Sequence, residues 1–221
     1  SLLPLEEAVR RARAAGEDAA LPSLLFADVA DNPGGGGRGN TVWILEAFHA
    51  ADVQGAVLGM FNDPELAAEA HLLGPGARFT AQFNRVETNH FSHSFVAEAE
   101  VVALHDGRII GRRGLYAGRE VDMGPMALLR IGGLRVAVAT QRRQLCEPAM
   151  LEALGVDIAA VRSLVVKSRG HFRAGFDERF TPDRILEVDV PGLTTVMLDR
   201  VPWRAVPRPI WPLDPAMDWA P

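Results

Sequence analysis

The feature that most constrains this sequence is a glycine-rich segment, Gly34 to Gly39, in which five of six residues are glycine. The apolar residues 24–29 before it predict a buried strand, and residues 42–50 after it have a helical pattern. Glycine permits positive φ and close approach of the backbone to another group. Because N–H groups at a helix start point out of the helix, this order of elements predicts a site for an anion or a polar group, with Asp31 and Asn32 at the end of the strand.

The segment comes close to the nucleotide-binding P-loop. Gly34, Gly39 and Thr41 follow that spacing, but Asn40 stands where the phosphate-binding lysine is needed. Asparagine is a good N-cap without charge, so we expect Asn40 to start a helix at Thr41 and to hold a triphosphate poorly. Two interpretations stay open. The loop binds a carboxylate, a phosphate or another polar substrate group, or it is a tight turn whose glycines only permit close packing.

Composition limits the class of protein. The chain has 221 residues, 48% of them hydrophobic, which is enough for one large domain with a core. A net charge of −5 with dispersed basic residues argues against a nucleic-acid partner. We find no run of membrane-spanning length and no signal peptide, and Cys146 is the only cysteine, so we expect a cytoplasmic protein with no membrane partner and no disulfide. Because the chain begins at Ser1 rather than methionine, we expect a fragment or a tagged form of a protein.

The hydrophobic pattern predicts an α/β fold, a single domain with a mixed parallel/antiparallel sheet flanked by helices. Residues 1–22 are expected to form a lead-in helix and linker, and residues 23–221 the domain, with a Pro/Trp-rich tail at 201–221. Proline forbids regular structure in this tail, so we expect its tryptophans to be buried against the body or a partner. We expect helices at residues 4–15, 40–50, 63–71 and 147–155, and strands at 23–29, 55–60, 78–83, 95–104, 108–111, 126–131, 134–140, 163–166 and 184–190.

Turn signals divide this pattern. Strand, loop, helix, strand and helix follow one another up to residue 71, which predicts parallel pairing. After residues 74–76, Gly-Pro-Gly, short alternating runs predict antiparallel strands. His105-Asp106-Gly107 and Gly132-Gly133 are expected to be hairpin turns.

A second polar group follows the apolar residues 163–166. Lys167 is the only lysine among 23 basic residues, and Lys167, Ser168 and His171 are expected to open a helix. Since ligands of α/β sheets bind at the carboxyl ends of the strands, we expect this group and the glycine loop to face one crevice. In the alternative, Lys167 and His171 only cap and pair structurally. The candidate substrate- or anion-binding residues are Asp31, Asn32, Gly34, Gly35, Gly36, Thr41, Lys167, Ser168 and His171.

Metal and nucleophile signals are weak in this chain. His90 and His93 would share one face of a helix with Glu87, but their surroundings predict a loop that enters a strand. Nothing local activates Cys146, which is expected to be a buried thiol. We therefore assign no catalytic residue and no metal ligand.

Five motifs in order resemble the C-terminal domain of MlrC-like proteins, a metallopeptidase family named for the degradation of linearised microcystin. The likeness extends over nearly the whole chain. The motifs are residues 31–36 (DNPGGG), 120–125 (EVDMGP), 165–172 (VVKSRGHF), 191–192 (PG) and 208–215 (RPIWPLDP).

The resemblance implies half of an enzyme. The family's zinc ligands lie in a separate N-terminal domain without a counterpart here, so zinc is expected in that missing domain and no cofactor in this chain. The resemblance implies that this chain binds a peptide or small-molecule substrate, is inactive alone, and completes a metal-dependent hydrolase with the N-terminal catalytic domain. Self-association into a homo-oligomer is a further expectation. Two other classes stay open: an independent small-anion-binding module that uses the glycine loop and Lys167, and an oligomerisation scaffold that uses the tail.

Overall fold

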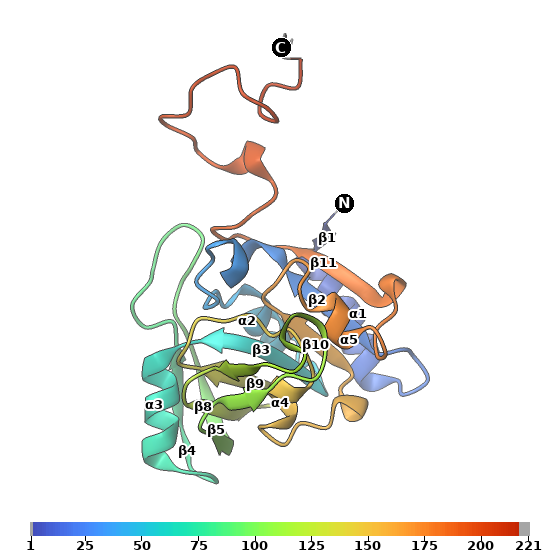
Figure 1. Ribbon diagram of the computed structural model, residues 1–221, viewed down its shortest axis with the longest axis vertical. Helices are drawn as coiled ribbons and strands as arrows, with labels where there is room; N and C mark the ends of the chain where they lie inside the picture. The colour runs from blue at the N-terminus through green and yellow to red at the C-terminus, as the bar shows by residue number, and fades with distance from the viewer. Residues whose placement is uncertain (1, 217–221) are drawn as a thin grey trace.

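A nine-stranded mixed sheet forms the centre of the protein (Figure 1). The structure, a computed structural model, describes residues 2–216. The strand order is β1-β11-β2-β10-β3-β9-β8-β5-β4. The strands are β1 (Leu3–Pro4), β2 (Leu24–Asp28), β3 (Ala56–Asn62), β4 (Arg78–Phe83), β5 (Phe95–His105), β8 (Met126–Ile131), β9 (Leu134–Ala139), β10 (Ser163–Val166) and β11 (Ile185–Asp189).

The sheet changes from parallel to antiparallel pairing at β9. Strands β1, β11, β2, β10, β3 and β9 pair in parallel, whereas β9, β8, β5 and β4 pair antiparallel. Strand β10 lies between β2 and β3, with Ser163 in register with Leu24 and Ala56. All four residues of β10 are buried, as expected for a strand covered on both faces. The expected single domain with a mixed sheet and flanking helices is confirmed.

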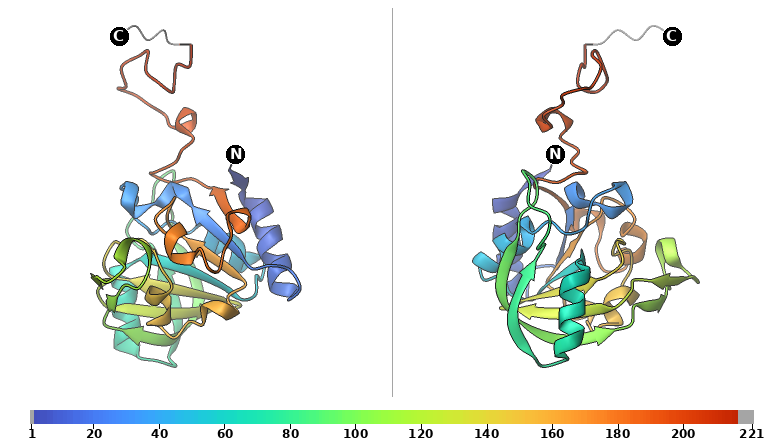
Figure 2. Two further views of the ribbon diagram at one scale, coloured as in Figure 1. Left: turned by 45° about the vertical axis from the view of Figure 1, so that its right-hand side comes forward. Right: turned by 90° about the vertical axis from the view of Figure 1, so that its left-hand side faces the viewer.

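Helices cover both faces of the sheet (Figure 2). Helices α1 (Leu5–Glu17), α2 (Trp43–Ala50) and α3 (Pro64–Leu73) contribute to one hydrophobic cluster, and the short helices α4 (Ala149–Glu152) and α5 (Arg173–Phe176) to the other. Successive side chains of β2 point to opposite faces of the sheet, so Phe26 belongs to the first cluster and Leu25 to the second. The result is a three-layer arrangement with the sheet in the middle.

One of the two expected hairpin turns is confirmed. Gly132 and Gly133 join β8 to β9, with Ile131 opposite Leu134. The His105-Asp106-Gly107 prediction was wrong as a hairpin, because β5 pairs with β4 and β8. After this turn the chain leaves the main sheet and forms β6 (Arg108–Ile110), which pairs with β7 (Glu120–Asp122) in a small second sheet. Ile109 and Val121 attach this small sheet to the cluster around α4 and α5.

Two helix starts differ from expectation. Helix α2 begins at Trp43, with Val42 as its N-cap, and not at Thr41. Asn40 does not cap it, because its Oδ1, the atom that would accept a helix N–H, has no hydrogen-bond partner among the described residues. Its side-chain NH2 donates instead to Asn84 Oδ1 at 3.2 Å and Glu87 Oε2 at 3.1 Å. The helix expected from Lys167 is also absent, since turns follow β10 and α5 begins only at Arg173.

The C-terminal segment extends away from the body as an arm, defined here as residues 195–216 (Figures 1 and 2). Its tryptophans are not buried against the body, since Trp203 is 47% and Trp211 70% exposed. Trp219 lies outside the described residues. None of the helices in the described chain has the length and hydropathy of a transmembrane segment.

Candidate functional site

The glycine loop encloses the carboxylate of Asp31. Strand β2 runs into two 3-10 turns, Val29–Asp31 and Pro33–Gly35. Asp31 Oδ1 accepts the backbone N–H of Gly39 at 2.7 Å, and Asp31 Oδ2 accepts that of Thr41 at 2.8 Å. The N–H groups expected to receive an external anion at these two positions therefore bond to a carboxylate of the chain itself.

The glycines close this loop tightly. The N–H groups of Gly35 and Gly37 both donate to the carbonyl of Asn32 at 2.9 Å. A Cβ at Gly37 would lie 2.7 Å from Asn32 N, and Gly39 has a φ of +76°. Close packing and positive φ thus account for Gly37 and Gly39. Gly34, Gly35 and Gly36 are exposed, although Gly36 also has a positive φ of +99°.

Beneath the loop, the ammonium group of Lys167 binds two carboxylates. Its Nζ donates to Asp28 Oδ2 and Asp31 Oδ2, both at 3.0 Å, and to the carbonyl of Thr41 at 2.7 Å. The Thr41 hydroxyl lies 3.0 Å from both Nζ and Asp31 Oδ2. All four residues are buried, so we call Asp28, Asp31, Thr41 and Lys167 the buried cluster. It joins the carboxyl ends of β2 and β10.

The charges in the buried cluster stabilise one another unequally. Burial and the neighbouring Asp31 charge raise the pKa of Asp28 above its usual range despite Lys167. Burial also acts to raise the pKa of Asp31, but Lys167 and the N–H groups of Thr41 and Gly39 outweigh it and lower that pKa. Burial alone would lower the pKa of Lys167, yet the two carboxylates raise it. The dominant charged pair is therefore Asp31 with Lys167.

Above the buried cluster lies a chain of polar side chains that reaches the surface. The backbone N–H of Gly34 donates to Asn32 Oδ1 at 3.0 Å, and Gln144 Nε2 donates to the same oxygen. Gln144 Nε2 also lies 3.0 Å from Ser168 Oγ, and Gln144 Oε1 lies 2.6 Å from His171 Nδ1. We call Asn32, Gln144, Ser168 and His171 the edge chain.

The edge chain sets the tautomer of His171. The N–H of Gly34 can only donate, which identifies Asn32 Oδ1 as an acceptor and the Gln144 atom beside it as the amide nitrogen. Gln144 then presents its oxygen to His171 Nδ1, so Nδ1 carries the proton. In the neutral ring Nε2 is left as an acceptor on an exposed side chain. His171 Nε2 can therefore accept a hydrogen bond from a ligand.

The nine residues selected from the sequence thus fall into two layers. Asp31, Thr41 and Lys167 form the buried layer, and Asn32, Gly34, Gly35, Gly36, Ser168 and His171 belong to the loop and the edge chain. Sequence reasoning missed Asp28 and Gln144. Asp28 could have been noticed as a single charged residue inside the apolar residues 24–29. Gln144 could have been noticed because it follows shortly after β9, a parallel strand of the sheet.

The comparisons with known proteins agree with this architecture. The family model described as MlrC C-terminus matches residues 26–205. The chain belongs to the MlrC C-terminus family. The resemblance drawn from the five motifs is confirmed.

Two relatives of this MlrC C-terminal chain are longer proteins. It is 29% identical over 161 residues to Microcystinase C of Sphingomonas sp., which covers 70% of this chain and 30% of that protein. A crystal structure described as a putative metallopeptidase, from Mesorhizobium sp. BNC1, aligns with a TM-score of 0.81 and 26% identity. That alignment covers 100% of this chain and 42% of the other. The chain therefore spans less than half of either relative.

In this MlrC C-terminal chain the described residues do not provide a metal centre. Residues 2–216 contain no group of three or more His, Cys, Asp or Glu side chains placed to hold an ion. His93 Nε2 pairs with Glu46 Oε2 at 2.7 Å, and its ring packs against Trp43. Cys146 is buried, as expected, and burial raises the pKa of its thiol to about 12. We therefore assign no metal ligand among residues 2–216.

Proposed function

We propose that this chain is the substrate-holding C-terminal part of a metal-dependent peptidase or amidohydrolase-like enzyme. A zinc ion would be bound by an N-terminal domain outside this sequence. Membership of the MlrC C-terminus family and the named relatives support this proposal. The chain spans 30% of one relative and 42% of the other, so the rest of each relative is long enough to contain such a domain.

The observation that carries the proposal is the edge chain above the buried cluster. His171 Nε2 is an exposed acceptor whose orientation follows from three successive contacts to the glycine loop. An acceptor held in this way can take the N–H of a peptide or amide and fix its direction. Positioning a substrate against a reactive group supplies several kcal/mol of barrier reduction. Asp31 and Lys167 lie beneath the edge chain, and their ion pair fixes the carboxylate that binds the N–H of Gly39 in the glycine loop.

The division of roles follows from these positions. His171, Asn32 and the exposed glycines at Gly34–Gly36 contact the substrate, and the upstream domain provides the metal. We assign no catalytic residue to this chain, so the chain alone is expected to be inactive. Its partners are the N-terminal domain and a peptide or small-molecule substrate.

The test joins this chain to its native upstream sequence and follows peptide hydrolysis with and without a metal chelator. Hydrolysis should require both the upstream domain and the metal. His171→Asn should raise KM or lower kcat/KM at an unchanged melting temperature. His49→Asn is the control, because His49 lies beside the β8–β9 turn at Gly132, at the amino end of β9, whereas the candidate site lies at the carboxyl ends of the parallel strands.

Three results would contradict the proposal. One is hydrolysis by the 221-residue chain alone, and another is hydrolysis that survives chelation. The third is a His171→Asn protein with unchanged kinetics, which would show that the edge chain does not hold the substrate.

A further inference from the structure

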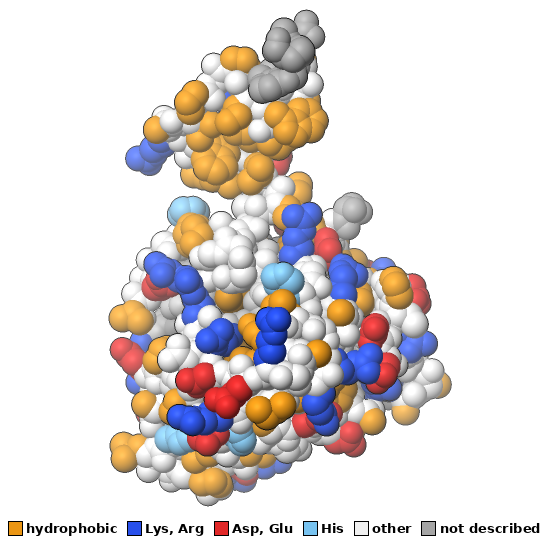
Figure 3. All heavy atoms as spheres, in the orientation of Figure 1, with side chains coloured by type: hydrophobic (Ala, Val, Ile, Leu, Met, Phe, Trp, Pro, Cys, Tyr) orange, Lys and Arg blue, Asp and Glu red, His pale blue; other side chains and the backbone are white. Residues whose placement is uncertain are grey.

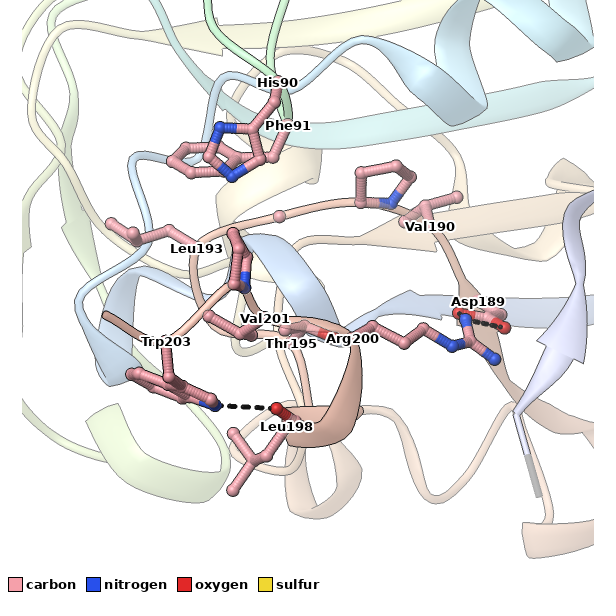
Figure 4. Close-up of a pocket in the computed structure, with 13 residues that line it drawn as sticks. His90, Phe91, Asp189, Val190, Leu193, Thr195, Leu198, Arg200, Val201 and Trp203 are labelled. Atoms are coloured by element: carbon pink, nitrogen blue, oxygen red, sulfur yellow. Dashed lines mark hydrogen bonds and ion pairs between the residues drawn. The ribbon is translucent and has the colours of Figure 1, made fainter. Parts of the chain in front are cut away.

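The apolar side chains of the arm, which Figure 3 shows above the charged surface of the body, continue into a cavity at its base. The cavity has a volume of about 520 Å³, within the range of small-molecule sites. Figure 4 shows His90 and Phe91, from the loop between β4 and β5, on one side of it and the Trp203 indole on the other. Its main apolar walls are Phe91, Val190, Leu193, Leu198, Val201 and Trp203.

Hydrogen bonds to the backbone hold the two aromatic walls in place. The indole N–H of Trp203 donates to Leu198 O at 2.8 Å. On the other side, the indole N–H of Trp43 on α2 donates to Phe91 O at 2.9 Å. The ring centroids of His90 and Phe91 lie 4.5 Å apart in an edge-to-face arrangement. Because its walls are already ordered, the cavity imposes little ordering cost on a ligand, as is typical of binding sites.

The segment of residues 190–195 connects the cavity to the glycine loop. The N–H of Thr194 donates to Ala30 O at 2.8 Å, and the Thr194 hydroxyl accepts the N–H of Asn32 at 2.9 Å. Leu193 and Thr195, on either side of Thr194, line the cavity. The cavity therefore begins next to the residues that carry the candidate site.

The glycine loop lies between the cavity and the edge chain. A Cβ at Gly35 would lie 3.3 Å from Thr194 Cγ2, whereas a Cβ at Gly34 would lie 2.8 Å from Gln144 Nε2. Gly34 therefore faces the edge chain, and Gly35 faces the segment that lines the cavity. Since both glycines are exposed, a ligand bound at His171 can extend across them towards the cavity.

The charged groups of the cavity neutralise each other. Among the described residues that line it, the carboxylate belongs to Asp189 and the guanidinium to Arg200. Arg200 Nη1 donates to both carboxylate oxygens of Asp189, at 2.9 Å and 2.8 Å, and Figure 4 shows this pair at one side of the cavity. A charged ligand group would lose water among the apolar walls without finding a free counter-charge. The cavity therefore favours an uncharged group.

We propose that this cavity is the subsite for a large uncharged side chain of the substrate, aromatic or branched aliphatic. The proposal rests on the proposed function, because it assigns the cavity to the substrate that the edge chain holds. A single side chain fits a concave cavity of this size, whereas a protein partner would have to cover about 1,200 Å² or more. Loss of one methylene from a group held in such a pocket costs roughly 10–200-fold in specificity. The cavity would therefore select the side chain, while the edge chain fixes the direction of the backbone.

The first test titrates the 221-residue chain with N-acetylated amino-acid amides and follows the indole N–H signal of Trp203 by NMR. Trp203→Phe identifies this signal. The phenylalanine and leucine amides should shift it to saturation, whereas the glycine and aspartate amides should not. Leu193→Arg, at an exposed position of the cavity, should weaken binding roughly tenfold or more. Leu72→Arg is the matched control, because Leu72 is also an exposed leucine but lies on α3. Circular dichroism establishes that each variant is folded.

The second test uses the chain joined to its native upstream sequence and peptides that carry Phe, Leu, Gly or Asp at each position in turn. At one position, Phe or Leu should raise kcat/KM roughly tenfold or more over Gly. Leu193→Arg should lower kcat/KM for the Phe and Leu peptides more than for the Gly peptides, and Leu72→Arg should change none of these values.

The two tests separate this proposal from the hydrolase function. Binding of the phenylalanine amide at Trp203 without hydrolysis of any peptide would contradict the hydrolase function but support the cavity as a site for an apolar side chain. Hydrolysis without a preference for Phe or Leu at any position would overturn the subsite, as would a Trp203 signal that neither amide shifts. A Trp203 signal that changes with protein concentration, and that Trp211→Ser makes constant, would show that the arm of another copy occupies the cavity and would also overturn the proposal.

Discussion

Replacing Lys167 by methionine keeps the length of the side chain and removes the only ammonium of the buried cluster. In the wild type, this group donates to Asp28, Asp31 and Thr41. The variant leaves two buried carboxylates without their cation. The loss should therefore appear as a lower free energy of unfolding.

The structure sets the size of this loss. Removing one partner of a buried ion pair costs about 3–5 kcal/mol. Asp31 keeps two backbone N–H donors, from Gly39 and Thr41, and burial already favours the protonated form of Asp28. Both effects reduce the cost, so we expect a loss of about 3 kcal/mol at neutral pH. With a slope of about 2 kcal/mol per molar urea, the unfolding midpoint falls by about 1.5 M.

The assay is urea unfolding at neutral and acidic pH, followed by circular dichroism. Without Lys167 the folded-state pKa of Asp31 rises, so the folded variant binds more protons as the pH falls. In the wild type this pKa is lowered, so the stability from Asp31 is lost as the pH falls through it. The free energies of unfolding of the wild type and of Lys167→Met should therefore become similar at acidic pH. Arg130→Met, which breaks the exposed pair with Glu100, should produce no resolvable change. A loss below about 1 kcal/mol, or one independent of pH, would refute this account of the buried cluster.

Two further predictions concern alkaline pH and a tautomer. Because the carboxylates raise the pKa of Lys167 above 10.5, its stabilisation is complete below that pH and is lost as the pH rises through the folded value; Lys167→Met should lack this alkaline loss in thermal unfolding. The ring of neutral His171 should carry its proton on Nδ1, and ¹⁵N NMR should show the other tautomer gaining population in Gln144→Leu. An unchanged tautomer in that variant would indicate that Gln144 does not orient the ring.

Hydrophobic periodicity in the sequence determined most of the architecture. The predicted strands at 78–83, 126–131 and 163–166 agree with β4, β8 and β10 at both ends. The Gly-Gly pair that joins β8 to β9 was also identified correctly. These features depend on neighbouring residues, because alternation and turn chemistry act over a few positions along the chain. The family was recognisable for the same reason, since each of its motifs is short and continuous.

Helix starts and the pairing of β5 depended on contacts that are distant in sequence. Asn40 is a good N-cap by residue type, but its NH2 is bound to Asn84 and Glu87 and its Oδ1 accepts no helix N–H among the described residues; α2 starts at Trp43. Asp106-Gly107 is a good hairpin signal, yet β5 is already paired on both sides with β4 and β8. A local preference worth about 1 kcal/mol yields to such competing bonds.

The same distinction applies to the candidate site. Chain order and the rule that ligands bind at carboxyl ends of parallel strands brought the glycine loop and Lys167 to one edge. Only the tertiary structure decided that Asp31 occupies the loop, that Asp28 joins Lys167 across 139 positions, and that Gln144 connects Asn32 to His171. A hydrogen bond depends on distances of a few tenths of an ångström between side chains. Those distances follow from strand register and packing, which no local pattern in the sequence specifies.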